Sequence, residues 1–391
     1  MNIQSQKPKR TPVWLSADSG DFETFRQIVG QTADPADTPH AAEVVRNIPI
    51  YDGAAVDAAA AAVPARRQAL MEEWAHVFAN GAGIIVIRQG LADHAVIDRA
   101  SVLFEEIIAE EKRSAKGGGD HFAKPGANDR IWNALEKHCL ADPANFAAYF
   151  SSNSIALAAE AWLGPASQMT AQVNRVNPGG AAQTPHRDYH LGFMSAARMA
   201  QFPAHIHAVS PTLTLQGAIA HCDMPVETGP TMLLPFSQQF FEGYLAFSRP
   251  EFQAHFAAHH VQLPLNKGDL VFFNPAVMHG AGTNHTADRF RMVNLLQVSS
   301  AFGRAMETVN RTRMLRALYP ALRVARGVTL ENVIAASAEG YPFPTNLDSN
   351  PPVGGLAPKT QADFLREALA QDQDDATFFA LLDALDAKNQ S

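Results

Sequence analysis

Short apolar segments separated by turns fill the middle of the chain, and they constrain its fold more than any other feature. Between Gln168 and Ser299 these segments read MTAQVNRV, TLTLQGAIAHC, TMLLPF, DLVFFNP and RMVNLLQV. Several alternate with a period of two and others are continuously apolar, which is the pattern of strands buried on one or both faces. The stretch predicts an antiparallel barrel or sandwich.

Helical periodicity surrounds this β region on both sides. We expect helices over 22–29, 66–80, 92–113, 144–162, 360–369 and 376–388, and a short buried strand in IIVI (84–87). The alanine-rich run 54–64 fits a linker and a helix equally well. The sequence therefore predicts a mainly β core with flanking helices. We divide it into an N-terminal extension (1–65), a core domain (66–302) and a C-terminal helical extension packed on the core (303–391).

Composition narrows the possible partners and the compartment. The chain has 391 residues, 47% hydrophobic and 18% charged, with a net charge of −8, so nucleic acid and anionic membranes are poor partners. Cys139 and Cys222 are the only cysteines, too few for a disulfide framework. The N-terminus has no apolar signal region and no run reaches spanning length. We expect a cytoplasmic protein; its oligomeric state does not follow from the sequence.

The segment TPHRDYHLGF (184–193) places two imidazoles and a carboxylate close together. If the segment is a strand, His186 and Asp188 point to one side and Arg187 to the other. Two histidines and one carboxylate form the facial triad of non-haem Fe(II) oxygenases, which leaves open positions on the metal. His279, which follows a predicted buried strand and precedes a glycine turn, is the best candidate for the third ligand.

The segment NHTADRFRMVNLLQVS (284–299) places arginines on a predicted strand after His279. Arg289 and Arg291 share one face with Val293 and Leu295. An arginine that points into an apolar barrel needs a buried anion, and its planar guanidinium suits a carboxylate. A cosubstrate with one carboxylate on the metal and another on this arginine would be 2-oxoglutarate.

The chain resembles the phytanoyl-CoA dioxygenase family of Fe(II)- and 2-oxoglutarate-dependent oxygenases from about residue 78 to about residue 298. Four segments carry the resemblance in family order: VNRVNPGGAAQTPHRDYH, AHCDMPVETGPTMLLPFSQQ, KGDLVFFNPAVMHGAGTN and ADRFRMVNLLQV. The resemblance implies a double-stranded β-helix, a jelly-roll or cupin-like barrel. It also implies that His186, Asp188 and His279 are the catalytic Fe(II) ligands.

The sequence departs from the family pattern at three positions. Gln238 replaces a usual histidine, and Ala281 replaces a serine that commonly helps to bind 2-oxoglutarate. Neither arginine has the family's usual spacing from the histidine, since Arg289 is one residue too near and Arg291 one residue too far. We favour Arg291 because RMVNLLQV aligns with the family strand, and we retain Arg289 as the alternative.

Other polar residues are weaker candidates. Asn177 either caps the Pro-Gly-Gly turn or, by the resemblance, reaches the metal-bound carboxylate of 2-oxoglutarate. Lys124, Arg130 and Trp132 lie in a glycine-rich segment that we expect to cover the barrel mouth and to contact substrate. His190, two residues after Asp188, is a further substrate candidate, although a strand-end histidine is more often a supporting or surface residue.

These features predict an enzyme that hydroxylates a small molecule with Fe(II), 2-oxoglutarate and O2, and that releases succinate and CO2. Two alternatives stay open from the residues alone. One is a metal-dependent hydrolase or isomerase on a cupin-like barrel, which would not need the strand arginine. The other is a non-catalytic barrel that binds a small ligand. The substrate itself does not follow from the sequence.

Overall fold

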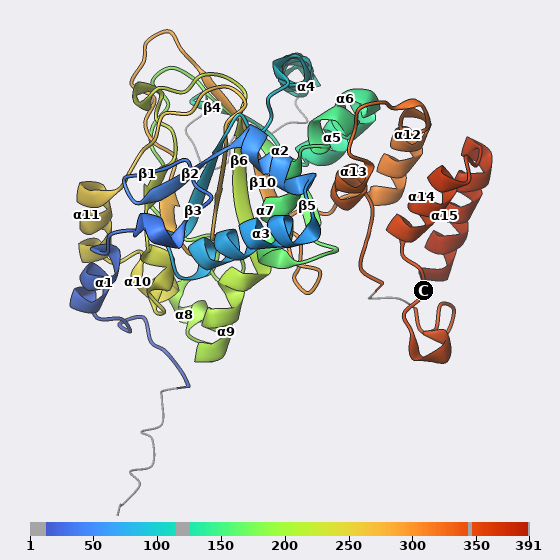
Figure 1. Ribbon diagram of the computed structural model, residues 1–391. Helices are drawn as coiled ribbons and strands as arrows, with labels where there is room; N and C mark the ends of the chain where they lie inside the picture. The colour runs from blue at the N-terminus through green and yellow to red at the C-terminus, as the bar shows by residue number, and fades with distance from the viewer. Residues whose placement is uncertain (1–12, 115–125, 343–345, 390–391) are drawn as a thin grey trace, which may run out of the picture.

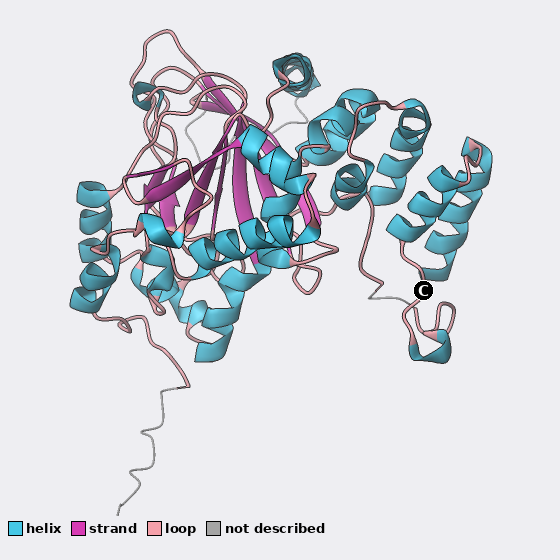
Figure 2. Cartoon of the chain, in the orientation of Figure 1, coloured by secondary structure: helices cyan, strands magenta, loops and turns pink. Residues whose placement is uncertain are grey.

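A twisted sheet runs through the centre of the protein (Figures 1 and 2). The computed structural model describes residues 13–114, 126–342 and 346–389. Within these residues the main sheet has eight strands, in the spatial order β1 (Glu43–Val45), β2 (Ile48–Asp52), β3 (Ile84–Arg88), β8 (Leu270–Phe273), β6 (Thr214–Ala220), β10 (Arg291–Ser299), β5 (Gln168–Val176) and β4 (Asn128–Ile131). Most strands that are neighbours in the sheet are far apart in the sequence, so the sheet depends on contacts between distant segments.

Strand β10 holds the two halves of this sheet together. It pairs antiparallel with β5 on one side and with β6 on the other, so that Gln297 lies opposite both Thr170 and Gln216. The remaining neighbours are also antiparallel except β2 and β3, which are parallel. The side chains of β10 therefore meet those of two other strands on each face of the sheet.

A smaller sheet faces the main one. Its strands β7 (Met232–Leu234) and β9 (Met278–Gly280) are antiparallel. Isolated bridges extend it, joining His279 to His186 and Leu233 to Val261. Two facing sheets of this kind form the double-stranded β-helix that the resemblance implies.

The two faces of the main sheet bury different cores. The face toward the helices packs Met169, Leu215 and Leu296 into a large cluster with α3 (Pro64–Ala79), α5 (Ala134–Ala141) and α7 (Asn153–Leu163). The other face points between the two sheets and contributes Ala218 and Phe273 to a smaller cluster. Neighbouring residues of a strand point to opposite faces, so each strand supplies both cores. We call the space between the two sheets the barrel interior.

Helices cover the main sheet (Figure 1), and Leu234 and Met278 of the small sheet pack against helical residues such as Phe252. The helices before the β core are α1 (Phe22–Val29), α2 (Gly53–Ala60), α3 (Pro64–Ala79), α4 (His94–Ser114), α5 (Ala134–Ala141), α6 (Pro143–Phe150) and α7 (Asn153–Leu163). Those within it are α8 (Ala196–Met199), α9 (Ala204–Val209), α10 (Gly243–Ala246) and α11 (Pro250–His259). Those after it are α12 (Arg311–Val324), α13 (Leu330–Ser337), α14 (Gln361–Ala370) and α15 (Asp375–Asn389).

The C-terminal helices pack on the helices that cover the sheet. α12 contacts α5 and α6, and α13 contacts β5, α6 and α7. Arg311 donates to the carbonyl oxygens of Ala336 and Met169, at 3.2 and 3.1 Å, and so ties α12 to β5. Tyr319 stacks on Phe378 with ring centroids 4.1 Å apart, which joins α12 to α15. The C-terminal region thus shares the large apolar cluster with the core domain.

The structure differs from the sequence-based expectation in three segments. Within the range assigned to the N-terminal extension, β1 and β2 form one edge of the main sheet, although no strand was expected there. The single helix expected over 144–162 is two helices, since the Ser152 side chain caps α7 by accepting the Ile155 N–H. The segment around His186 forms an isolated bridge instead of a strand. The undecided alanine-rich run is helical, as α2.

Two further expectations concern the glycine-rich segment over the barrel mouth and the presence of membrane-spanning helices. Lys124 and most of the glycine-rich segment expected over the barrel mouth lie outside the described residues. In the part of the chain that is described, every helix is too short or too polar to cross a bilayer.

Candidate metal centre

His186 and His279 are paired through their backbones. The His186 N–H donates to the His279 carbonyl at 2.8 Å, and the His279 N–H donates back to the His186 carbonyl at 3.0 Å. The two rings therefore lie side by side, with centroids 4.6 Å apart. Two residues far apart in the sequence are thus held next to each other by main-chain hydrogen bonds, which do not depend on their side chains.

Both imidazoles have the same ring nitrogen engaged. Nδ1 of His186 lies 2.8 Å from the Thr184 carbonyl oxygen, and Nδ1 of His279 lies 2.8 Å from the Val277 carbonyl oxygen. A carbonyl only accepts, so each Nδ1 carries a proton, and in the neutral form of each ring Nε2 is the nitrogen with the free lone pair. Such hydrogen bonds also orient the ligand rings in metal sites.

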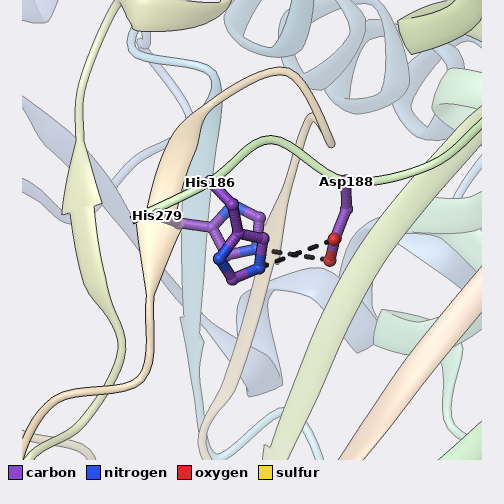
Figure 3. Close-up of side chains that lie close together, drawn as sticks. All are labelled: His186, Asp188 and His279. Atoms are coloured by element: carbon purple, nitrogen blue, oxygen red, sulfur yellow. Dashed lines mark ion pairs between the residues drawn. The ribbon is translucent and has the colours of Figure 1, made fainter. Parts of the chain in front are cut away.

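The free nitrogens of both rings face Asp188, as Figure 3 shows. His186 Nε2 lies 3.5 Å from one carboxylate oxygen and His279 Nε2 lies 3.5 Å from the other. Taken together, the three donor atoms lie within 4.8 Å of one another. Among the described residues this is the group of histidine, cysteine and acidic side chains with a spacing that suits a metal ion.

The Asp188 carboxylate is fixed by its surroundings. The Gln216 amide N–H donates to its Oδ2 at 2.5 Å. Its backbone N–H donates to the Pro275 carbonyl at 3.0 Å, and the Tyr244 hydroxyl donates to its backbone carbonyl at 2.9 Å. These contacts hold Asp188 in place although the segment that carries it is not a regular strand.

The pKa shifts of Asp188 and His186 favour the binding of a cation. Burial by itself would raise the pKa of Asp188, but the hydrogen bond and charge of His279, the charge of His186 and the Gln216 amide lower it to about 2. Burial and the nearby His279 lower the pKa of His186. A carboxylate that is ionised and an imidazole that is neutral at pH 7 are the forms that bind metal. Two imidazoles and one carboxylate on one side of an ion match the facial triad, so the residues present fit Fe(II).

Arg187 points away from the metal-facing side, as the sequence predicts, and it anchors the segment. Its guanidinium is buried and donates to the carbonyl oxygens of Phe240, at 3.1 Å, and Ser237. Gly243 packs against it so closely that a Cβ there would lie 1.8 Å from the guanidinium carbon. The Ser237 hydroxyl accepts the N–H of Met278, the neighbour of His279, at 2.7 Å. Ser237 therefore touches both segments that carry the histidines.

The two candidate arginines differ sharply in the structure. Arg291 is 4% exposed and donates to the carbonyl oxygens of Thr228 and Gly282, at 2.6 and 3.4 Å, whereas Arg289 is exposed and precedes β10. Burial lowers the pKa of Arg291 to about 10, so it stays charged at neutral pH. No acidic side chain in the described part of the chain forms an ion pair with it. A buried cation without an acidic partner fits an anionic ligand.

Asn177 has local hydrogen bonds. Its side-chain oxygen accepts from Arg175 at 2.7 Å, and its amide nitrogen donates to the Gly126 carbonyl and the Asp129 carboxylate at 3.1 and 3.3 Å. These contacts fit the turn-capping alternative, because they join the end of β5 to the start of β4. None of them involves the triad.

The substrate candidates lie in different places. Arg130, in β4, donates to the Gln172 side chain at 3.0 Å and lies over the Trp132 ring, 5.0 Å from its centroid. His190 follows Tyr189, and both have positive φ angles, 44° and 66°. Such angles are uncommon for residues other than glycine and are found at functional sites. The structure thus groups Arg130 with Trp132 and places His190 in the strained turn after Asp188.

Two supporting residues were missed by the sequence analysis. Gln216 lies in an otherwise apolar segment, TLTLQGAIA, and a lone amide in a strand that is buried on both faces is a signal of a polar contact inside. Gly243 gives no such signal, because the need for a glycine arises from Arg187, which lies far from it in the sequence.

Comparison with known proteins agrees with this description. The sequence model of the phytanoyl-CoA dioxygenase family matches residues 60–293, more than half of the chain. Dioxygenase FrzG of Cladobotryum sp is 29% identical over 127 residues, which make up 31% of this chain and 36% of FrzG. The chain therefore matches about a third of the length of that curated relative.

Solved structures provide more distant likenesses. AviO1 from Streptomyces viridochromogenes is 19% identical, with a TM-score of 0.44 over 61% of this chain and 97% of AviO1. SnoN, a non-haem α-ketoglutarate-dependent epimerase from nogalamycin biosynthesis, is 19% identical, with a TM-score of 0.41 over 60% of this chain and 82% of SnoN.

The double-stranded β-helix and the family match define a non-haem iron, 2-oxoglutarate-dependent dioxygenase. The chain belongs to the phytanoyl-CoA dioxygenase family. Fe(II) is the cofactor of this family and 2-oxoglutarate its cosubstrate. Membership in this family favours an oxidative enzyme over the hydrolytic and non-catalytic alternatives.

Proposed function

We propose that the protein hydroxylates a small-molecule substrate, with Fe(II) held by His186, Asp188 and His279. The observation that carries this proposal is the convergence of the Nε2 atoms of two imidazoles on one carboxylate, with each Nδ1 held by a backbone carbonyl. Arg291 is the residue that we assign to the far carboxylate of 2-oxoglutarate, because it is buried, charged and points into the barrel interior. We do not assign that role to Arg289, which is exposed.

The chain contributes orientation and exclusion of water. The backbone pairing of His186 with His279 fixes the spacing of the two rings, and Gln216 holds the carboxylate toward them. Phe273 covers the His279 ring, with centroids 4.8 Å apart, and so limits access of water from that side. With O2, bound iron and 2-oxoglutarate supply the oxidising power that places one oxygen atom in a substrate C–H bond and releases succinate and CO2.

We retain three residues as candidates for contact with the substrate: Arg130, Trp132 and His190. Arg130 lies in β4 and Trp132 directly follows it, at the end of the sheet where the described chain resumes after residue 125. His190 has both ring nitrogens buried without a hydrogen-bond partner among the described residues. Asn177 is better explained by its turn contacts, so we give it no part in binding 2-oxoglutarate.

Isotope labelling tests the hydroxylation. The purified protein is incubated with Fe(II), 2-oxoglutarate, a substrate mixture and 18O2, and succinate and products are analysed by mass spectrometry. Hydroxylation predicts one 18O atom in succinate and one in the product. Succinate that carries 18O beside a product without it would point to another oxidative outcome, such as desaturation or epimerisation. His279→Ala should form no succinate above a metal-free control.

We also propose the cytoplasm as the compartment of the enzyme. Cys139 and Cys222 are both free thiols, as expected where the surroundings are reducing. Fractionation of the source cells with an antibody to the protein tests this; detection outside the cytoplasm would contradict it.

A further inference from the structure

The barrel interior has an apolar side and a polar side. Toward β3 and β8 it is lined by residues such as Val86, Val271 and Phe273. Toward β5 and β10 amide side chains replace them. We define the polar wall as Gln172, Asn174, Gln216, Gln297 and Glu307. The first four are strand residues at most 6% exposed, and Glu307 lies in the loop after β10.

The polar wall begins at the metal centre. Gln216 donates to Asp188, and Gln297 lies directly opposite Gln216 in the β6–β10 register. Side chains that lie opposite each other in antiparallel strands have Cβ atoms about 5 Å apart. Gln297 also shares the interior face with Val293 and Leu295, because residues two apart in a strand point the same way. Its amide is therefore one side chain away from the carboxylate of the triad.

A second chain of contacts leads from the metal centre to the same wall. The hydroxyl of Tyr189, the neighbour of Asp188, donates to the Met306 sulfur at 3.2 Å. The Gln172 amide nitrogen donates to that sulfur at 3.1 Å, and its oxygen accepts from Arg130 at 3.0 Å. Glu307 follows Met306 and accepts the Asn133 N–H at 2.6 Å with one oxygen. The wall is thus continuous from Asp188 to β4.

Four acceptor atoms of this wall have no partner among the described residues. They are Oε1 of Gln216, Oε1 of Gln297, Oδ1 of Asn174 and Oε2 of Glu307. The amide of Gln216 cannot be reversed, because its nitrogen must face the acceptor-only carboxylate of Asp188. Each buried acceptor left unpaired costs free energy, so four that face one space call for hydrogen-bond donors, which a ligand or the water that it displaces can supply.

The chemistry of the wall selects the kind of ligand. The four acceptors require hydrogen-bond donors, and Tyr189 and Gln172 place donors beside them. A hydroxyl group donates and accepts, so it suits a surface of this kind. Arg130 and Glu307 carry opposite charges and lie close enough to attract each other. Arg130, which lies beside the wall, therefore offsets the charge of Glu307, and the wall offers no uncompensated charge to an ionic group.

From this arrangement, and resting on the oxygenase function proposed above, we propose that the polar wall is the substrate-binding surface. Its substrate is a compact, uncharged molecule with several hydroxyl groups, of the cyclitol or glycoside type. An acyl chain would leave the four acceptors unpaired and would fit the apolar side instead. Gln297 and Asn174 are then specificity-determining residues, since their orphan oxygens accept from substrate hydroxyls.

Saturation-transfer NMR on the protein loaded with Zn(II) and 2-oxoglutarate tests this without turnover. The probes are myo-inositol and methyl α-D-glucopyranoside, compared with cyclohexanol and octanoyl-CoA. We expect transfer to the two polyols, and binding roughly three- to tenfold weaker in Gln297→Met and Asn174→Leu, the worth of one neutral hydrogen bond. Gln373→Met is the matched control, because Gln373 also has a buried orphan oxygen but lies between α14 and α15.

The outcomes separate the two proposals. Binding of cyclohexanol or octanoyl-CoA in preference to the polyols would overturn the inference, as would absence of polyol binding by protein that binds Zn(II) and 2-oxoglutarate. Equal polyol binding by Gln297→Met and the wild type would overturn it too. Failure to bind Zn(II) or 2-oxoglutarate would instead refute the proposed function, and the inference with it. If Gln297→Met does not fold, Gln297→Asn can replace it. Asparagine keeps the amide but holds it one methylene farther from the ligand, and we expect the same weakening of polyol binding.

Discussion

Arg187 and Gly243 form a single packed unit: the guanidinium occupies the space that any side chain at position 243 would need. The arginine lies between the two metal-facing residues of its segment, and its hydrogen bonds reach the turn at Ser237, which also binds the backbone next to His279. The geometry of the metal centre therefore depends on a contact on the far side of its own segment.

Replacement of Gly243 by alanine should disturb the metal centre from a distance. The new Cβ would lie 1.8 Å from the Arg187 guanidinium carbon, so the arginine must move and release its carbonyl partners. We expect weaker binding of Co(II), followed by its visible absorption, and a lower melting temperature. Gly303→Ala is the control, since its nearest neighbours would lie at 3.3 Å or beyond. Unchanged Co(II) binding by Gly243→Ala would show that Arg187 does not position the ligands.

Loss of any one ligand should abolish tight metal binding. His186→Ala, Asp188→Ala and His279→Ala each leave two donors, too few to hold a labile ferrous ion against water. Metal content after dialysis measures the effect, and circular dichroism checks that each variant is folded. A variant that keeps full iron content and activity would remove its residue from the triad.

Arg291 and Arg289 should respond differently to truncation. Arg291→Ala removes a charge-assisted hydrogen-bonding group worth about 1.5–3 kcal/mol. The concentration of 2-oxoglutarate needed for half-maximal succinate formation should then rise roughly ten- to a hundredfold. Arg289→Ala should change it little, because Arg289 is exposed. The reverse pattern would exchange the roles of the two residues.

Stability should fall in mild acid because two histidines are buried as neutral rings. Burial lowers the pKa of His138 to about 4 and that of His221 to about 3. The unfolded chain binds protons on these rings below about pH 6.5. The folded state does not, so the free energy of unfolding decreases as the pH falls from 6.5 toward 4. Each ring contributes up to about 3 kcal/mol to this decrease.

Chemical denaturation at pH 7 and pH 4.5 measures this dependence. His138 Nε2 donates to the Asn145 side-chain oxygen at 2.8 Å, and the ring nitrogens of His221 lie 2.8 Å from the hydroxyl oxygens of Ser101 and Tyr149. Glutamine can replace part of each interaction. The double variant His138→Gln/His221→Gln should be less stable than the wild type at pH 7. Its free energy of unfolding should, however, decrease less between pH 7 and pH 4.5. An equal decrease in the free energy of unfolding of the wild type and the double variant would mean that other groups cause most of the destabilisation in acid.

Local patterns allowed much of the fold to be predicted from the sequence. The helix over 22–29 begins and ends as expected, because Asp21 accepts the Thr24 N–H and Gly30 follows its last turn. The strand of residues 291–298 also matches β10 within a residue. Such segments carry their own start and stop signals, which do not depend on the rest of the chain.

The parts that could not be predicted depend on distant partners. Nothing local shows that residues 43–52 join the main sheet, since β2 finds its parallel partner β3 only in the folded protein. The spacing of His186 and Asp188 indicated a metal site although the assumed strand does not form. What brings the two side chains to one side is instead the bridge to His279 and the anchoring of Arg187. The orphan acceptors of the polar wall are likewise visible only in three dimensions.

The position of β10 in the sheet has a consequence for synthesis of the chain. It is the last strand of the main sheet to leave the ribosome, yet it belongs in the middle, between β5 and β6. Until residue 299 has emerged, both neighbours present open edges that invite pairing with other chains. Contacts over such long sequence separations also form slowly. Nascent or truncated chains that end before Arg291 should therefore need chaperones and aggregate readily, whereas chains that lack only the helices after residue 303 still pair β10 with β5 and β6.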